Sequence, residues 1–440
     1  MIFQNESQTA FLKLVQSSAA RKADAEKRLR YYYDNQMADL EAIIARRWSR
    51  PEDFRLFCVN LTRKITDKRA MVYRAAPTRQ FDGWEQAKGE ALYRAMGVDV
   101  TLKKANRYVK LLKTTMLKIG WNGSGPTLSV VTPNILDVVA DDPENPSKVI
   151  VTHKGSRPDL TEYSIWTATG YQRVDFKGRS LPLRDNPDGV NPYGLIPLAP
   201  LFDRAPDDEF FLPGGADLIA AQEALNVALA NLWRAIELAS HGQPWATGLT
   251  PGEAIRSGPD HTIILPEGST FQFAAPNTPV GSCLAAIEFL LRQTAIANDL
   301  SADVFDLAKR AESGAAKLME SRDLIEARQD DVELWRLYES RLFEVLKRVV
   351  NTHAPGTIPE DARVRVDFGE PMETLSENAR IEAYARRMAL GIWSPVDALM
   401  ADNRDIKTRE EAATILSERA AETQRFTPMN DLPRFGTPGQ

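Results

Sequence analysis

The feature that most constrains the fold is a long stretch after Pro213-Gly214-Gly215 in which nearly every side chain is apolar or small. A helix that runs from there to about Ser240 spans ~39 Å at 1.5 Å per residue. A helix that is apolar on all sides must be buried by neighbours. It is not a membrane span, because three charged residues interrupt its most apolar part, Leu218 to Ala239: Glu223, Arg234 and Glu237.

A second helix of small residues is predicted over Cys283 to Asn298, with Ser282 as its N-cap. Between the two helices, the chain turns at His241-Gly242-Gln243-Pro244 and contains two strand-like pieces, Thr262 to Leu265 and Thr270 to Ala274. The predicted order is therefore helix, small β tip, helix, which describes a long stalk with a compact end.

The N-terminal part reads as helices over roughly 8–50, 53–75, 82–96 and Thr101 to Lys118. The last of these has an apolar side but carries six basic residues and no acid: Lys103, Lys104, Arg107, Lys110, Lys113 and Lys118. Two interpretations stay open. The residues form the solvated face of an amphipathic helix, or they contact phosphate or an acidic partner.

After Gly120 the sequence changes to short β-branched runs between turn residues, which predicts a small β-rich unit. The predicted strands are Leu128 to Thr132, Ile135 to Val139, Lys148 to His153, Glu162 to Thr167, Tyr171 to Phe176 and Leu195 to Leu201.

The C-terminal part is predicted to be mostly helical. One helix runs from about Gly314 to Val350, with a polar stretch over Glu326 to Asp331 that faces solvent or a polar partner. A strand at Arg363 to Asp367 and three helices follow, at about Leu375 to Ala389, Pro395 to Met400 and Thr408 to Gln424. The fold class is therefore mainly α with a β-rich part (α+β), and 440 residues predict two to four structural units.

Charge is distributed unevenly along the chain. Up to Lys118 there are 24 Lys and Arg against 13 Asp and Glu, a net of +11, and the remaining 322 residues carry 31 against 47, a net of −16. Pairing between basic and acidic parts of one fold or assembly explains such a split, and a nucleic-acid surface is the alternative. The N-terminus shows no secretory signal, and two cysteines 225 positions apart fit a reducing compartment.

The sequence nominates no catalytic, cofactor-binding or metal-binding residues. The four histidines lack metal-ligand spacing, Gly123-Ser124-Gly125 lacks the Lys of a phosphate loop, and neither Cys58 nor Cys283 has a histidine nearby in sequence. We therefore expect a protein that is not an enzyme and needs no cofactor. An enzyme with dispersed carboxylates and no metal remains an alternative.

The order of parts, together with three local motifs, resembles the portal proteins of tailed bacteriophages, the head-to-tail connector family. The motifs are Asn191-Pro192-Tyr193-Gly194-Leu195-Ile196-Pro197 before the first stalk helix, Ser313-Gly314-Ala315-Ala316-Lys317-Leu318, and Gly391-Ile392-Trp393-Ser394 before a helical end. The resemblance covers nearly the whole chain, and the order of the motifs is more specific than any one of them.

In the terms of that family, the resemblance implies a wing, a stem, a clip and a crown. The wing would be 1–212 with 314–372, the stem 213–240 with 281–299, the clip 241–280, the tunnel loop 300–313, and the crown and C-terminal tail 373–440. It also implies a homo-dodecameric ring at one vertex of the viral capsid, a virion component assembled in the host cytoplasm.

Such a ring is a conduit for DNA packaging and DNA ejection. The implied partners are further copies of the chain, double-stranded DNA passing without sequence specificity, terminase, the major capsid protein and head-completion or adaptor proteins, with no membrane. The clip would be the terminase docking face. Another oligomeric capsid or adaptor protein is the main alternative.

Two groups of residues follow from this resemblance. The tunnel residues would be Asp303, Phe305, Lys309, Arg310 and Glu312, although Val304, Phe305 and Leu307 alternatively anchor an ordinary connector in the wing core. The residues that join subunits through the stem would be Leu218, Leu225, Leu229, Leu232, Trp233 and Ile236. Between Gly215 and Leu300 the acids exceed the bases by five, which suits a conduit through which DNA slides.

Overall fold

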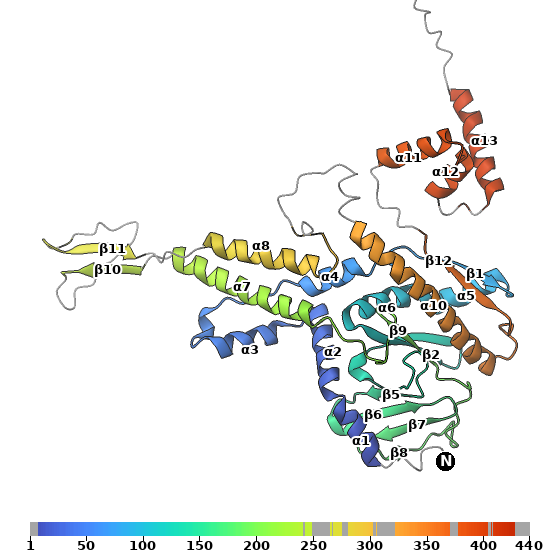
Figure 1. The fold of residues 1–440 in the computed structure, drawn as a ribbon, viewed down its shortest axis with the longest axis horizontal. Helices are drawn as coiled ribbons and strands as arrows, with labels where there is room; N and C mark the ends of the chain where they lie inside the picture. Colours follow the sequence, from blue (N-terminus) through green and yellow to red (C-terminus); the bar gives the residue numbers. More distant parts are fainter. Residues whose placement is uncertain are drawn as a thin grey trace, which may run out of the picture. The chain divides into compact units, whose positions relative to one another are not determined.

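The computed structural model describes residues 8–240, 243–248, 265, 267–274, 280–301, 305, 322–369, 377–403, 406 and 408–426. The fold mixes helices with several antiparallel sheets (Figure 1). Contacts within the chain divide it into two compact units, the first formed by 1–310 with 320–370 and the second by 311–319 with 371–440.

The N-terminal helices are shorter than the sequence predicts. The region 8–50 forms α1 (Gln8–Ser17), α2 (Ala19–Tyr32) and α3 (Met37–Arg47), and the chain turns before α3 at Asp34, which has a φ of 64°. Most of 53–75 is not helical, and only α4 (Leu61–Arg69) forms there. It begins where it does because the Asn60 side chain accepts a hydrogen bond from the backbone N–H of Arg63.

The prediction of a helix over Thr101 to Lys118 is wrong in its second part. α5 (Gln86–Ala95) is followed by α6 (Val98–Leu112), which ends at Lys113 with a φ of 70°. The next residues form β2 (Thr114–Trp121), the central strand of a sheet with β3 (Pro126–Val131) and β9 (Leu198–Phe202). Because β2 pairs with β3 on one edge and with β9 on the other, this segment is a strand. The apolar residues here have a helical spacing, but strand pairing overrides it.

The predicted β-rich unit is confirmed. β4 (Leu136–Val139), β5 (Lys148–His153), β6 (Glu162–Trp166), β7 (Tyr171–Asp175) and β8 (Ser180–Leu181) follow one another in an antiparallel meander. α1 covers one face of this sheet through Phe11, which packs with Ile150 and Val174. The turn before β9 is closed by Asn191, whose amide donates to the carbonyls of Thr167 and Leu195.

The largest apolar core lies between the three-stranded sheet, α6 and α10 (Arg322–His353). β12 (Arg363–Asp367) pairs with β1 (Thr78–Asp82), more than 280 positions earlier in sequence. The polar stretch in the first part of α10 finds its partners inside the chain. Arg328 donates to the carbonyl of Gly369, and Asp331 accepts from Lys110.

The predicted stalk is present as α7 (Ala216–Ser240) and α8 (Val280–Ile296), which lie side by side (Figure 1). α8 begins at Val280, so Ser282 is not its N-cap. β10 (Gln243–Thr247) and β11 (Thr270–Ala274) form an antiparallel hairpin between the two helices in sequence. The other predicted strand, Thr262 to Leu265, lies largely outside the described residues.

The second unit contains three helices close to those predicted: α11 (Glu377–Ala389), α12 (Pro395–Asp402) and α13 (Arg409–Phe426). Gly391 has a φ of 71° at the end of α11, and Ser394 caps α12 in a reciprocal pair with Asp397. The Gly391-to-Ser394 motif is therefore a helix stop followed by a helix start.

A buried amide fixes α7 to the rest of the first unit. The Gln222 side-chain oxygen accepts from the backbone N–H groups of Leu61, at 2.6 Å, and Thr62, at 3.0 Å. Its NH₂ group donates to the carbonyl of Val59 at 2.6 Å and to Asn226 at 3.0 Å. One side chain of α7 therefore satisfies the first amides of α4, which have no partner inside their own helix.

We predict that Gln222→Ala lowers the free energy of unfolding by about 2 to 4 kcal/mol, because the Thr62 N–H loses its buried partner and the Leu61 N–H and the Val59 carbonyl are left with the bond between them. Gln16→Ala, at an exposed position of α1, is the matched control and should change stability by less than about 0.5 kcal/mol. Denaturant unfolding followed by circular dichroism measures both. Equal stability of the two variants would contradict the role given to Gln222.

Candidate functional site at the root of the helix pair

Helix α7 is covered on two sides by its own chain. One cluster joins it to α4 and α8, with the buried members Leu61, Ile65, Leu218, Leu225, Ile287, Ala295 and Leu300. A second cluster joins Val227 and Ala230 to α3 through Leu40 and Ile44. Much of the surface of α7 is therefore covered by other parts of the same chain.

The six residues predicted to join subunits through the stem differ in exposure. Leu218 and Leu225 are only 6% and 3% exposed and belong to the chain's own core. Leu229 and Leu232 are half-buried against the same cluster, and Ile236 is half-buried farther along the helix. Trp233 is 37% exposed, with the Arg55 guanidinium 5.4 Å from its ring centre.

Of the five predicted tunnel residues, the structure describes Phe305 alone. Phe305 is half-buried and packs against the cluster of α4, α7 and α8. Asp303, Lys309, Arg310 and Glu312 lie outside the described residues, as do Val304 and Leu307.

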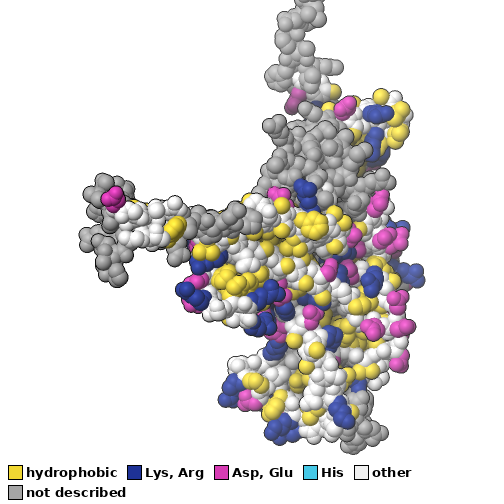
Figure 2. Space-filling model, turned by 60° about the vertical axis from the view of Figure 1, so that its left-hand side comes forward, with side chains coloured by type: hydrophobic (Ala, Val, Ile, Leu, Met, Phe, Trp, Pro, Cys, Tyr) yellow, Lys and Arg dark blue, Asp and Glu magenta, His cyan; other side chains and the backbone are white. Residues whose placement is uncertain are grey.

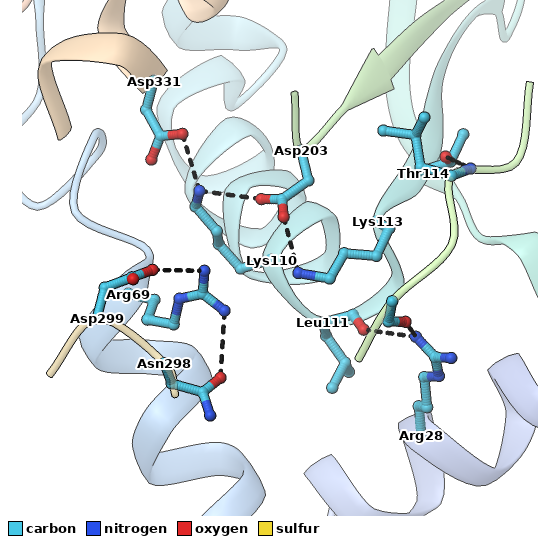
Figure 3. A network of polar contacts seen from close by, with 12 residues as sticks. Arg28, Arg69, Lys110, Leu111, Lys113, Thr114, Asp203, Asn298, Asp299 and Asp331 are labelled. Carbon is cyan, nitrogen blue, oxygen red and sulfur yellow. Dashed lines mark hydrogen bonds and ion pairs between the residues drawn. The ribbon is translucent and has the colours of Figure 1, made fainter. Parts of the chain in front are cut away.

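Just before that segment, α4 fixes the chain that leaves α8. The Arg69 guanidinium donates to the Asn298 side chain at 3.2 Å and pairs with the Asp299 carboxylate at 3.1 Å (Figure 3). Asp299 has a φ of 58°, so the backbone turns sharply at the point where arginine holds it. The contacts of Arg69 with two successive residues therefore set the direction in which the chain leaves α8.

Beside this contact, one largely buried ammonium group binds two carboxylates. Lys110 of α6 lies 2.9 Å from Asp203, after β9, and 2.8 Å from Asp331 of α10, while Lys113 lies 2.7 Å from Asp203 (Figure 3). The two lysines, Asp203 and Asp331 come from three segments that lie far apart in sequence. The network therefore joins α6, the end of the three-stranded sheet and the long helix α10 at one point.

The pKa values in this network shift in different directions. Burial lowers the pKa of Lys110, but the two carboxylates outweigh burial and the net shift is upward. Burial raises the pKa of Asp203, but Lys110 and Lys113 outweigh it and the net shift is downward. For Asp331 burial dominates over Lys110, and the pKa rises. Asp203 is thus the better-stabilised carboxylate of the two.

The basic run in the sequence is consequently not a solvated helix face throughout. Lys110 and Lys113 are paired internally, and Lys118 lies half-buried on β2, where burial lowers its pKa. Arg107 pairs with Asp67 at 3.2 Å. Much of the charge asymmetry between the N-terminal part and the rest therefore reflects pairing within the chain, which is the first of the two explanations drawn from the sequence.

Lys103 and Arg107 of α6, together with basic residues of α4 and the segment after it, surround a hollow of about 570 Å³. Six cationic side chains and one carboxylate line it: Arg63, Lys64, Lys68, Arg74, Lys103, Arg107 and Asp67. Asp67 is held by the Tyr32 hydroxyl at 2.7 Å as well as by Arg107. The surface can attract phosphate or carboxylate groups of a partner.

The described residues contain no group of three or more His, Cys, Asp or Glu side chains that could hold a metal ion. Cys58 is half-buried, and burial raises the pKa of its thiol, which disfavours the nucleophilic thiolate. His353 stacks on Trp121 with ring centres 4.7 Å apart. Among the helices described, none is long and apolar enough to cross a membrane.

The sequence matches no family model and no curated protein. Solved structures do resemble it. A chain from the neck of an empty GTA particle, computed with C6 symmetry, is 15% identical, with 76% of this chain and 86% of that chain covered and a TM-score of 0.48. A chain from the virion of a native gene transfer agent (GTA) particle is 16% identical, with coverages of 75% and 85% and a TM-score of 0.41.

We predict that Lys110→Met destabilises the protein by about 3 to 5 kcal/mol at neutral pH, because Asp203 and Asp331 lose the cation they share. Lys104→Met, at an exposed position of the same helix, is the control. The pKa of Asp203 lies below its usual value in the wild type, so its stabilisation is present above that value and is lost on acidification.

In the variant Asp331 loses Lys110 and Asp203 keeps Lys113 alone, so both carboxyl pKa values rise and acidification relieves the destabilisation. The stability gap between wild type and Lys110→Met should therefore be largest near pH 7 and shrink as the pH falls through about 4. Denaturant unfolding at a series of pH values measures the gap. A gap that is constant with pH would argue against the network.

Proposed function

We propose that this chain is a portal-type structural subunit, one copy in a ring that forms a passage for DNA at a vertex of a phage-like capsid. The observation that carries the proposal is the helix pair α7 and α8. A β hairpin lies between the two helices in sequence, and both helices expose large hydrophobic side chains to solvent. The preferred ring number is twelve, from the family that the sequence resembles.

The exposed apolar residues of the helix pair support assembly. Phe289, Ile296 and Leu284 of α8 are 64%, 54% and 47% exposed, and Trp233 and Leu238 are exposed on α7. In the space-filling view, hydrophobic side chains lie open to solvent around the root of the helix pair, next to Lys and Arg side chains (Figure 2). Apolar residues gathered in this way mark interaction surfaces in soluble proteins.

The charge of the helix pair favours a conduit for DNA and disfavours a site that binds DNA tightly. The segment from Gly215 to Leu300 has eight acidic residues, three arginines and no lysine. DNA-binding affinity comes mainly from neutralising phosphates with cations, so a surface of this composition holds DNA weakly. Weak, repulsive contact is what a conduit needs if DNA is to move through it.

In this proposal the hairpin β10–β11 belongs to the clip that docks terminase, and head-completion or adaptor proteins bind there later. The body of the first unit is the wing, and the second unit belongs to the crown. The chain acts as a virion component assembled in the host cytoplasm, contacts the major capsid protein, and needs neither catalytic activity nor a cofactor. Another oligomeric capsid or adaptor protein is the second candidate, and the exposed surfaces of the helix pair favour it equally.

We predict that the purified chain forms a closed ring whose mass is an integer multiple of 49.1 kDa, with twelve copies preferred. Light scattering gives the mass, and electron-microscope class averages down the particle axis count the subunits and show whether a central opening exists. A solid assembly without an opening would favour the second candidate. A monodisperse monomer at micromolar concentration would remove the proposal.

We also predict that Lys309→Glu with Arg310→Glu slows DNA packaging or weakens retention of packaged DNA while ring assembly stays intact. Both residues belong to the proposed tunnel loop, and they are the groups there that can touch phosphate transiently. Lys13→Glu with Lys177→Glu, at two exposed positions of the first unit, is the control for added negative charge. Packaging at the wild-type rate and yield by the loop variant would show that the two residues do not act on DNA.

A further inference from the structure

A groove of about 620 Å³ runs between α3 and α7. Its α7 side is formed by one helix face that includes three alanines four residues apart: Ala220, Ala224 and Ala228. Its α3 side is formed by Ile43, Arg46 and Arg47. Small residues along one helix face leave room for a bulky side chain of another helix to approach the backbone closely.

This groove lies beside α3 and not between α7 and α8. The α7 residues that pack toward α8 are Leu225, Leu229 and Leu232, and at 3.6 residues per turn the three alanines lie about a third of a turn away from them, with Ala228 bordering the cluster shared with α8. Each helix pair therefore has two different outer faces. One is the groove beside α3, and the other is the outer face of α8.

The outer face of α8 has the opposite shape. Phe289 and Ile296 are seven residues apart, which places them on one stripe of the helix, and both side chains are more than half exposed. Ala285 and Arg292 are exposed on the same side. The face is therefore a ridge with one protruding aromatic ring, and such a ring gains most when it enters an apolar hollow.

The two faces also complement each other in charge. No ion pair joins Arg46 or Arg47 to a carboxylate within the part of the chain that the structure describes, and Arg46 donates only to the carbonyl of Ala42 there. Glu288, exposed beside Phe289, likewise has no cationic partner among the described residues. Arg46 and Arg47 border the groove together with Glu223, whose carboxylate is held by Lys27 and the Tyr31 hydroxyl. Glu288 and Arg292 flank the ridge, and Glu288 can meet the two groove arginines when the ridge enters the groove.

We propose that the ridge of α8 in one copy packs into the groove between α3 and α7 of the next copy, with Phe289 over Ala224 and Glu288 beside Arg46 and Arg47. The inference rests on the proposed ring and names the surfaces that close it. Because the two faces differ, the contact is head-to-tail. Contacts of that kind generate rings or open filaments, whereas a two-fold dimer would pair identical faces.

The charge pair provides the test. Glu288→Arg, and separately Arg46→Glu with Arg47→Glu, place like charges at the contact and should raise the concentration at which half of the rings dissociate at least tenfold at low salt. Combining all three substitutions restores opposite charges and should recover most of the loss. Mass photometry over a dilution series gives the midpoints, and Glu333→Arg, an exposed position of α10, is the matched control.

The outcomes separate this inference from the proposed function. Wild-type rings together with charge-reversal variants that assemble like wild type overturn the inference and leave the ring standing, as does a triple variant no better than the single reversals. Rings that form normally in both reversals but fail to bind a later particle protein would assign the groove to that protein, which also overturns the inference. A wild-type chain that stays monomeric overturns both.

A cross-linking experiment checks the register. In a background of Cys58→Ser and Cys283→Ser, the pair Phe289→Cys with Ala224→Cys should give a ladder of disulfide-linked multimers on a non-reducing gel, because each copy carries both halves of the contact. Neither single variant should give more than trace dimer. Efficient dimer formation by Phe289→Cys alone would mean that two ridges meet each other, and the head-to-tail contact would be wrong.

Discussion

The arrangement of the first unit depends on Lys110, a largely buried ammonium group held between two carboxylates. Removing a charged group from water is costly, and the cost is offset only when opposite charges surround it at hydrogen-bond distance. Here Asp203 and Asp331 come from the end of the three-stranded sheet and from α10, so satisfying one lysine brings three elements together. Arg69 extends the same principle to the end of α8.

Helix α7 then has two roles that compete for its surface. It is part of the subunit's core, through Gln222 and the apolar clusters with α3, α4 and α8. It also presents a face of small residues that its own chain leaves open. A helix that is apolar nearly all round reconciles the two roles, because one side is buried within the chain while another stays open, and the proposed ring would use the open side.

Local patterns predicted the parts of the structure in which conformation depends on nearby residues. The β-branched run Lys148 to His153 and the alternating run Arg363 to Asp367 agree with β5 and β12 residue for residue. α7 ends where the sequence predicts. The pattern failed at Thr114 to Trp121, where one of the two strand partners, β9, lies 80 or more positions away in sequence. No spacing rule contains that pairing.

The sequence by itself determined the β-rich unit, the two stalk helices and the absence of a recognisable catalytic motif, since these follow from residue type and local spacing. Only the tertiary structure decided which basic residues are free for a partner. Lys103 and Lys110 look alike in sequence, but one lines an open hollow and the other is paired with Asp203 and Asp331. The tertiary structure also decided which apolar side chains of the helix pair are exposed, because Leu218 is buried and Phe289 is exposed. The reason is that burial and pairing are properties of distant segments brought into contact, and one helix cannot record in its own sequence which of its apolar residues its neighbours will cover.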